Sequence, residues 1–156
     1  TGDNTKNVAI KLAAKIKDAV LMDVASATIS AIEKYDNLIL GTSTWGIGDL
    51  QDDWDGFLPS LEKANLEGKT IALFGLGDSS SYSDTFADGI GILFETINNK
   101  GCTIIGMVST EGYTFDASRA DIGGHFVGLV LDEDNEYALT DIRIESWVNE
   151  ILPALQ

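Results

Sequence analysis

The sequence is poor in several residues on which common kinds of site depend. It has one cysteine, one histidine and two prolines among 156 residues. The lone Cys102 excludes an internal disulfide, and its place at the start of an apolar run predicts a buried strand thiol without special reactivity. The lone His125 excludes a cluster of histidine metal ligands, and its Gly-Gly-His-Phe setting favours a surface loop over a catalytic role.

Basic residues and long apolar runs are also scarce. There are 10 lysine and arginine residues against 25 acidic ones, a formal net charge of −15. Such a field repels nucleic acid and anionic lipid and favours a basic partner or none. No apolar run approaches the roughly 18 residues of a membrane span, and the N-terminus has no signal-peptide pattern. We therefore expect a cytoplasmic protein, a monomer, with no nucleic acid and no membrane among its partners.

Strand-like and helix-like apolar patterns alternate along the chain. Short apolar runs predict strands at 19–22, 38–41, 70–74 and 102–108. Helical spacing predicts helices between them and a last helix that begins at Thr140 or Asp141. This alternation is typical of a doubly wound α/β domain, in which a parallel sheet is covered on both faces and the loops after the strands form the site.

A long excursion, residues 109–135, separates the last predicted strand from the last helix. It is rich in glycine, aspartate and aromatic residues, and only residues 126–131 have a strand pattern. We expect this excursion to interrupt or extend the last strand of the sheet. No Pro-, Ser- or Gly-rich linker divides the chain, so residues 1–156 are predicted to form a single domain.

Three loops carry unusual residues for their positions. The loop 1–5 offers small polar residues and backbone N–H groups at a helix start, which suits a phosphate, although an ordinary helix N-cap explains it equally well. The loop 41–51 holds Trp45 between glycines, and the loop 74–84 holds Asp78 and Tyr82. Two aromatic rings at one sheet edge could grip a flat ligand; the alternative is that they cap the core separately.

Other kinds of chemistry lack their usual residues. The Gly75-Leu-Gly77 segment has no third glycine of a dinucleotide-binding fingerprint, and the chain has no Gly-Lys-Ser/Thr phosphate motif. No acid, base or nucleophile stands in a catalytic pattern. One acidic run lacks the ligand order of a calcium loop, and a solvated face explains it better. That run consists of Asp49, Asp52, Asp53 and Asp55.

Four motifs in order, at 42–54, 72–82, 111–118 and 126–135, resemble those of flavodoxins, specifically the long-chain type. The resemblance implies a doubly wound α/β fold with a parallel five-stranded sheet whose last strand is split by an insertion. It also implies one non-covalently bound FMN and a low-potential one-electron carrier that is not an enzyme. Its partners would be redox enzymes, a flavodoxin reductase and acceptor oxidoreductases, with basic docking faces.

The resemblance also assigns residues to the cofactor. The loop at the N-terminus would hold the phosphate, although compared with the usual family pattern it has either one extra residue or a shifted register. Trp45 would cover the inner face of the flavin ring and Tyr82 the outer face, the loop 75–78 would meet its pyrimidine edge, and Asp134 would lie near the ribose. Gly46 or Gly48 would let a peptide turn beside the ring. The whole cofactor-binding set is Thr1, Gly2, Asn4, Thr5, Thr42, Ser43, Thr44, Trp45, Gly46, Gly48, Gly75, Leu76, Gly77, Asp78, Tyr82 and Asp134.

Electrostatics favours the carrier. A strongly acidic protein without lysine in the two ring-facing loops disfavours added negative charge on the flavin and lowers its potential. The acidic run 49–55 would steer docking through weak, salt-sensitive contacts. The alternative is a small FMN-dependent NAD(P)H reductase of the same superfamily, although no pocket for its substrate is evident. A phospho-acceptor signalling domain would need an acidic cluster and a lysine that are not visible in the sequence.

One expectation concerns the N-terminus. In flavodoxins a buried first strand precedes the phosphate loop, whereas this sequence begins at the loop itself. Without that strand, neighbouring strands and apolar helix faces would be exposed, a large loss against a typical stability of about 5 to 15 kcal/mol. We therefore expect the natural protein to have about ten further residues before Thr1, the length of one strand and its approach.

Overall fold

A five-stranded, mostly parallel sheet forms the centre of the structure, a computed structural model that describes residues 3–156. Thr1 and Gly2 lie outside the described residues. The strand order is β2-β1-β3-β4, with β8 also paired to β3. β1, β4 and β8 run parallel to β3, whereas β2 returns antiparallel to β1. The bounds are β1 (Asn37–Trp45), β2 (Asp49–Leu50), β3 (Thr70–Leu76), β4 (Thr103–Ile105) and β8 (Leu129–Leu131).

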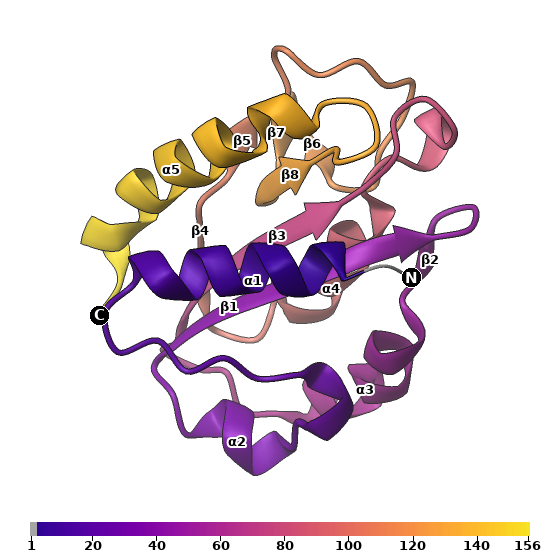
Figure 1. The fold of residues 1–156 in the computed structure, drawn as a ribbon. Helices are drawn as coiled ribbons and strands as arrows, with labels where there is room; N and C mark the ends of the chain where they lie inside the picture. The colour runs from indigo at the N-terminus through magenta and orange to yellow at the C-terminus, as the bar shows by residue number, and fades with distance from the viewer. Residues whose placement is uncertain (1–2) are drawn as a thin grey trace.

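Helices cover both faces of this sheet (Figure 1), which confirms the predicted doubly wound α/β fold. Side chains alternate along the fully buried β3, so that Ile71 and Leu73 join one apolar cluster while Phe74 joins the other. α1 (Asn4–Lys15) and α5 (Thr140–Ile151) cover the Phe74 face. The opposite face carries α2 (Ile29–Glu33), α3 (Asp52–Lys63) and α4 (Asp88–Ile97).

The last strand position is split, as predicted. β4 pairs with residues 70–72 of β3, and β8 pairs with residues 74–76 of the same strand. β4 and β8 are therefore two halves of one strand position, and the chain between them, residues 106–128, leaves the sheet and returns. Part of this insertion forms a small antiparallel sheet of order β5-β7-β6, made of β5 (Val108–Ser109), β6 (Asp121–Ile122) and β7 (His125–Phe126).

Aromatic packing attaches the insertion to the domain. Tyr113 and Phe126 lie edge to face with ring centroids 4.9 Å apart, and both contact the buried Phe86 just before α4. The Tyr113 hydroxyl donates to the carbonyl of Val130 at 2.7 Å, and the Arg143 guanidinium lies 4.0 Å from the Tyr113 ring centre. Burial raises the pKa of Tyr113 to about 12. These contacts hold the insertion against β8 and α5.

Short 3-10 turns complete the connections. They are η1 (Val24–Ser26), η2 (Ser83–Thr85), η3 (Tyr137–Leu139) and η4 (Leu152–Ala154). The longest helices, α1, α3 and α5, have 12 residues each. None of the helices within residues 3–156 has the length and apolar character needed to cross a bilayer.

Three strand predictions were wrong in extent or kind. Residues 19–22 form no strand, and Val20, Leu21 and Met22 are exposed, because a strand forms only where a neighbouring edge pairs with it. The strand expected at 102–108 is broken at Gly106, whose φ of +81° does not fit a ladder. The run 126–131 is divided between β7 and β8. Conversely, residues 41–45, expected in a loop, extend β1.

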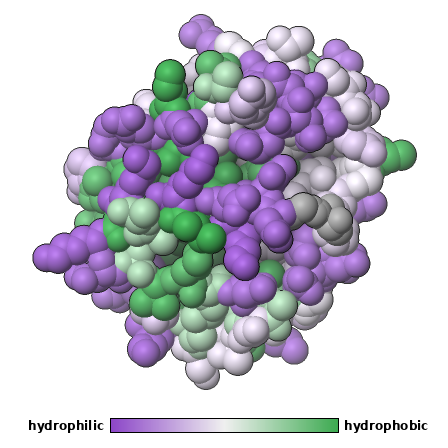
Figure 2. All heavy atoms as spheres, viewed as in Figure 1, coloured by the Kyte–Doolittle hydropathy of each residue, from purple (hydrophilic) through white to green (hydrophobic). Residues whose placement is uncertain are grey.

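The free edge of β1 is the other notable feature of the sheet. Over Asn37–Ser43, β1 pairs with β3 on one side only, and a wide cavity separates its other edge from residues 16–24. On the face that carries α1, hydrophobic side chains are visible among hydrophilic ones (Figure 2). A further strand before Thr1 remains a prediction.

We predict that Gly128→Ala is strongly destabilising. A Cβ at Gly128 would lie 2.0 Å from the carbonyl oxygen of Leu73, so the substitution would push β8 away from β3. Overpacking against backbone predicts a loss of about 3 kcal/mol in the free energy of unfolding, measured by urea denaturation. Gly56→Ala is the control: nothing lies within 4 Å of its Cβ position in α3, and it should stabilise by about 0.5 to 1 kcal/mol. Equal effects of the two substitutions would contradict this packing.

Candidate functional site

A cavity of about 1510 Å³ opens at the carboxyl ends of β1 and β3 and continues along the free edge of β1. Parallel strands in a doubly wound sheet place their following loops at one edge, which explains why distant segments meet here. Most of the predicted site residues line it. They are Asn4, Thr5, Thr42, Ser43, Thr44, Trp45, Leu76, Gly77, Asp78, Tyr82 and Asp134.

Three predicted glycines lie elsewhere. Gly46 and Gly48 form the turn between β1 and β2 with φ of +50° and +84°, a conformation that other residues rarely adopt. They lie beside the cavity wall rather than in it. Gly75 is inside β3, where a Cβ would approach Ile90 of α4 to 2.6 Å, so close helix packing accounts for this glycine. The remaining predicted pair, Thr1 and Gly2, lies outside the described residues.

Trp45 and Tyr82 approach the cavity from neighbouring loops. Trp45 is the last residue of β1, held in register opposite Asp49, and Tyr82 ends the loop after β3 with 42% of its surface exposed. Neither ring belongs to the two buried apolar clusters found within residues 3–156. This arrangement favours the ligand-clamp hypothesis over two separate caps of the core, since a core cap would be packed into one of those clusters.

Hydroxyl groups on β1 mainly support the site. Thr42 is buried and donates to the carbonyl of Ser43 at 2.9 Å. Thr44 accepts the N–H of Gly89, in the first turn of α4, at 2.9 Å. The Thr44 bond fixes the end of β1 against α4. The position of Trp45 is therefore set by the sheet on one side and by a helix start on the other.

The N-terminus of α1 faces the same cavity. Its N-cap, Asp3, makes no side-chain capping bond, and no acidic residue occupies the first turn. The first intrahelical bond runs from the N–H of Asn7 to the carbonyl of Asp3 at 2.8 Å. The N–H groups of Asn4, Thr5 and Lys6 therefore precede the helical bonding pattern, and these residues line the cavity. Within residues 3–156 this helix start has no side-chain cap, and with Lys6 in its first turn it suits an anion.

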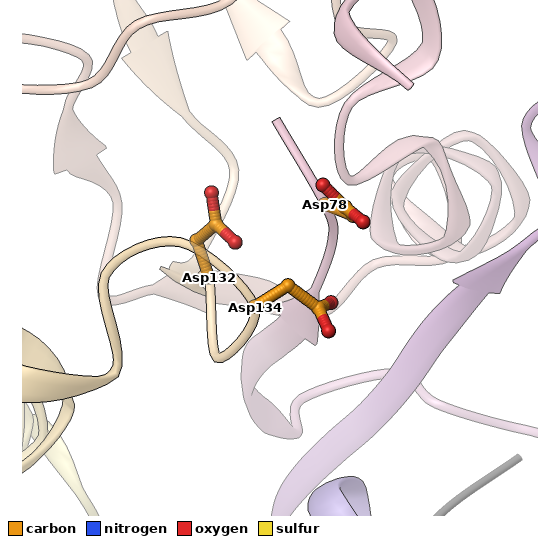
Figure 3. A group of neighbouring side chains, drawn as sticks. All are labelled: Asp78, Asp132 and Asp134. Atoms are coloured by element: carbon orange, nitrogen blue, oxygen red, sulfur yellow. The ribbon is translucent and has the colours of Figure 1, made fainter. Parts of the chain in front are cut away.

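Three aspartates gather at the edge of the cavity. Asp78 lies on the loop after β3, and Asp132 and Asp134 lie on the loop after β8 (Figure 3). One carboxylate oxygen of each lies within 4.8 Å of the others. Burial raises the pKa of Asp134, and the charges of Asp78, Asp132 and Glu133 raise it further. The three carboxylates come from two loops, so holding them together requires hydrogen-bond donors.

Donors from the loops satisfy two of these carboxylates. The Asp78 Oδ1 atom accepts the N–H groups of Ser80 at 3.2 Å and Ser81 at 3.0 Å, and the Asn135 side chain at 2.9 Å. The Ser81 N–H, followed by Asn135, holds the pKa of Asp78 below its usual range. Asp132 accepts from Ser79 and Asn135. The group therefore joins two loops.

Sequence reasoning missed part of this site. Glu133 and Lys6 line the cavity, and Asp132, Ser79 and Asn135 tie the loops behind it. One signal was available: Asp132 directly follows a short apolar run, the place where a parallel strand ends. The Ser79 donors could not be inferred, because they come from a loop more than 50 residues away.

The family model described as flavodoxin matches residues 1–147. The chain belongs to the flavodoxin family. It is 46% identical to a flavodoxin of Synechocystis over 136 residues, 87% of this chain and 80% of that protein. It is 45% identical to a flavodoxin of Helicobacter pylori over 148 residues, 95% of this chain and 89% of that protein. The family that the four sequence motifs predicted is thus confirmed, while the long-chain subtype remains a prediction.

A solved flavodoxin structure has the same fold. The Fusobacterium nucleatum flavodoxin bound to flavin mononucleotide superimposes with a TM-score of 0.95 at 30% identity, covering 100% of this chain and 94% of that one. This likeness confirms that the chain has the flavodoxin fold.

Asp78 gives the loop after β3 a predicted pH dependence. Its pKa lies below the ordinary value of 3.8, so the folded loop is stabilised by the carboxylate above that pH. This contribution is lost as the pH falls through the lowered pKa. Hydrogen exchange of the Ser80 and Ser81 amides, measured relative to β3 amides, should therefore lose protection below about pH 3.8. If exchange of the Ser80 and Ser81 amides in Asp78→Asn depends on pH as in the wild type, the Asp78 carboxylate is not the cause of that pH dependence.

Proposed function

We propose that this flavodoxin binds one FMN without a covalent bond and acts as a low-potential one-electron carrier. The observation that carries the proposal is the meeting of Trp45, Tyr82 and the α1 N-terminus in one cavity. FMN, when bound, supplies an isoalloxazine ring that accepts and donates electrons singly. The cavity exceeds the roughly 1,000 Å³ of large ligand pockets because it continues beside β1, so FMN would occupy its carboxyl end only.

Different residues of the site would contact different parts of FMN. The N–H groups and side chains of Asn4 and Thr5 would hold the phosphate, with Lys6 nearby. Trp45 and Tyr82 would pack on the two faces of the ring and exclude water. The Gly77–Asp78 backbone would meet the polar ring edge, and Asp134 would lie toward the ribose. This assignment follows the cavity lining and needs no acid, base or nucleophile.

The charge of the protein supports a low potential. The carboxylates of Asp78, Glu133 and Asp134 line the cavity, and the whole chain carries a formal charge of −15. Adding an electron to a ring in this field is disfavoured, which makes the reduced carrier a strong reductant. The loops that carry Trp45 and Tyr82 contain no lysine to offset the field.

The partners that we propose are redox enzymes with basic docking faces, a flavodoxin reductase and acceptor oxidoreductases. The acids beside the Trp45 turn are all exposed: Asp49, Asp52, Asp53 and Asp55. They would attract such faces while allowing fast release. We further propose that residues 1–156 act as one domain and as a monomer, in the cytoplasm, where the free Cys102 needs no disulfide partner.

Stepwise reduction of the FMN-loaded protein, followed by its visible spectrum, tests the carrier function. Two separate one-electron steps are expected, the second at low potential. A single two-electron step would count decisively against a carrier. The family match does not favour the alternative, an FMN-dependent NAD(P)H reductase. Steady-state oxidation of NAD(P)H by the isolated protein would favour that enzyme instead.

Trp45→Ala should weaken FMN binding and shift both potentials. Loss of one aromatic face should weaken the binding free energy of FMN by about 2 kcal/mol, which raises Kd roughly thirtyfold. The Kd is measured by quenching of FMN fluorescence. Tyr137→Ala is the control, because Tyr137 is 74% exposed and lies outside the cavity lining. Wild-type affinity and potentials in Trp45→Ala would mean that the indole is only a surface cap.

Electron transfer to a basic partner should slow as salt rises. The double variant Asp52→Asn/Asp55→Asn removes two exposed charges beside the Trp45 turn. We expect the salt dependence of the bimolecular rate constant, measured at low ionic strength, to fall several-fold. The matched control is Glu145→Gln/Glu150→Gln, which removes two exposed charges from α5. The rate is measured by stopped-flow reduction of cytochrome c, which serves as a basic probe. An equal change in salt dependence for the two double variants would argue against a local docking surface.

A further inference from the structure

Asp132 is a buried carboxylate that the proposed function does not use directly. It has 0% exposure, follows β8 immediately, and is absent from the cavity lining. Burying a carboxylate is unfavourable unless hydrogen bonds satisfy its charge, and here both oxygens are satisfied. Oδ2 accepts the Ser79 N–H at 3.2 Å and the Ser79 hydroxyl at 2.5 Å. Oδ1 accepts the N–H and side-chain amide of Asn135 at 3.1 Å and 2.9 Å.

The loop that Asp132 contacts is rigid within itself. Asp78 accepts the Ser80 and Ser81 N–H groups through its side chain and the Tyr82 N–H, at 2.9 Å, through its carbonyl. Residues 78–82 therefore form one hydrogen-bonded turn that carries Tyr82. Such a turn can change its orientation without losing its own bonds, so its placement depends on what ties it to the sheet.

Hydrogen bonds hold this turn at both ends among the described residues. Directly after Tyr82, Ser83 accepts the Asp116 N–H with its hydroxyl at 2.9 Å and the N–H groups of Asp116 and Ala117 with its carbonyl at 3.0 Å. The Gly77 N–H donates to the Leu131 carbonyl at 3.1 Å, which ends the β3–β8 ladder. Beyond that point Ser79 is held by Asp132, and the Asn135 amide bridges Asp132 and Asp78 at 2.9 Å each. Asp132 is thus the shared acceptor through which the loop after β8 holds the turn after β3.

We propose that Asp132 is a positioning residue for the cofactor: without reaching the cavity, it fixes the Asp78–Tyr82 turn against the loop that carries Asp134. This inference rests on the proposed function, since it is the ring-facing Tyr82 that Asp132 would place. Stacking depends on ring orientation, so releasing the turn lowers FMN affinity and shifts the flavin potentials.

Asp132→Asn is the decisive variant because it keeps the shape of the side chain. One oxygen becomes an NH₂ donor that faces either the Ser79 N–H or the two N–H donors of Asn135, so at least one bond is lost. We expect FMN to bind roughly tenfold more weakly and the amides of 79–82 to exchange faster. Ser79→Ala, which removes only the hydroxyl, should give a smaller effect in the same direction and remains informative if Asp132→Asn does not fold.

A charge effect and a positioning effect are separable. Asp134→Asn removes the same charge from an exposed position of this loop. No hydrogen bond to the Asp134 carboxylate is found within residues 3–156. This variant should therefore leave hydrogen exchange of the amides of 79–82 as in the wild type. If Asp132 acts through Ser79, Asp132→Asn changes FMN affinity less in a Ser79→Ala background than alone. Additive effects on affinity, together with the same exchange at 79–82 in Asp132→Asn as in Asp134→Asn, would overturn the proposal.

The two levels of inference fail in different ways. Suppose that the wild-type protein binds FMN and that Asp132→Asn changes neither hydrogen exchange, nor FMN affinity, nor the flavin potentials. This result rejects the positioning role and does not contradict the carrier function. Wild-type protein that does not bind FMN rejects the carrier. Hydrogen exchange in the FMN-free protein then still tests whether Asp132 holds the turn.

Discussion

The pairing of β3 on both edges is the constraint on which the rest of the structure depends. β1 lies along one edge and the split pair β4 and β8 along the other, all parallel. Every residue of β3 is buried, and its side chains alternate between two apolar clusters, so the strand joins both helical layers. Because parallel strands end at the same edge, this pairing also brings the loops of the site together.

The site follows from that edge. The end of β1 delivers Trp45, the loop after β3 delivers Asp78 and Tyr82, and the loop after β8 delivers Asp134, while α1 turns its N-terminus toward them. Backbone N–H groups, aromatic faces and carboxylates therefore surround one space. Such a lining binds and tunes a redox group, which agrees with a carrier whose chemistry resides in FMN.

Most of the fold and much of the cavity lining could be predicted from the sequence. Fully apolar runs such as 70–74 fixed the buried strand, and motif order indicated the family and the split strand. The failures share a cause. Residues 19–22 have strand composition but pair with no strand, because a cavity separates them from the free edge of β1. Gly106 interrupts residues 102–108, which their apolar composition predicts as one strand. Composition reports which segments can be buried; pairing decides which become strands.

By itself the sequence determined which residues are available to the site: Trp45 beside glycines, Tyr82 beyond Asp78, and an acidic surface. The tertiary structure alone decided how they are held. Gly75 proved to be a packing glycine under α4, and Asp132 proved to be the acceptor that ties two loops together. The physical reason is that hydrogen-bond partners and close contacts depend on distances between segments far apart in the chain, and local patterns carry no record of those distances.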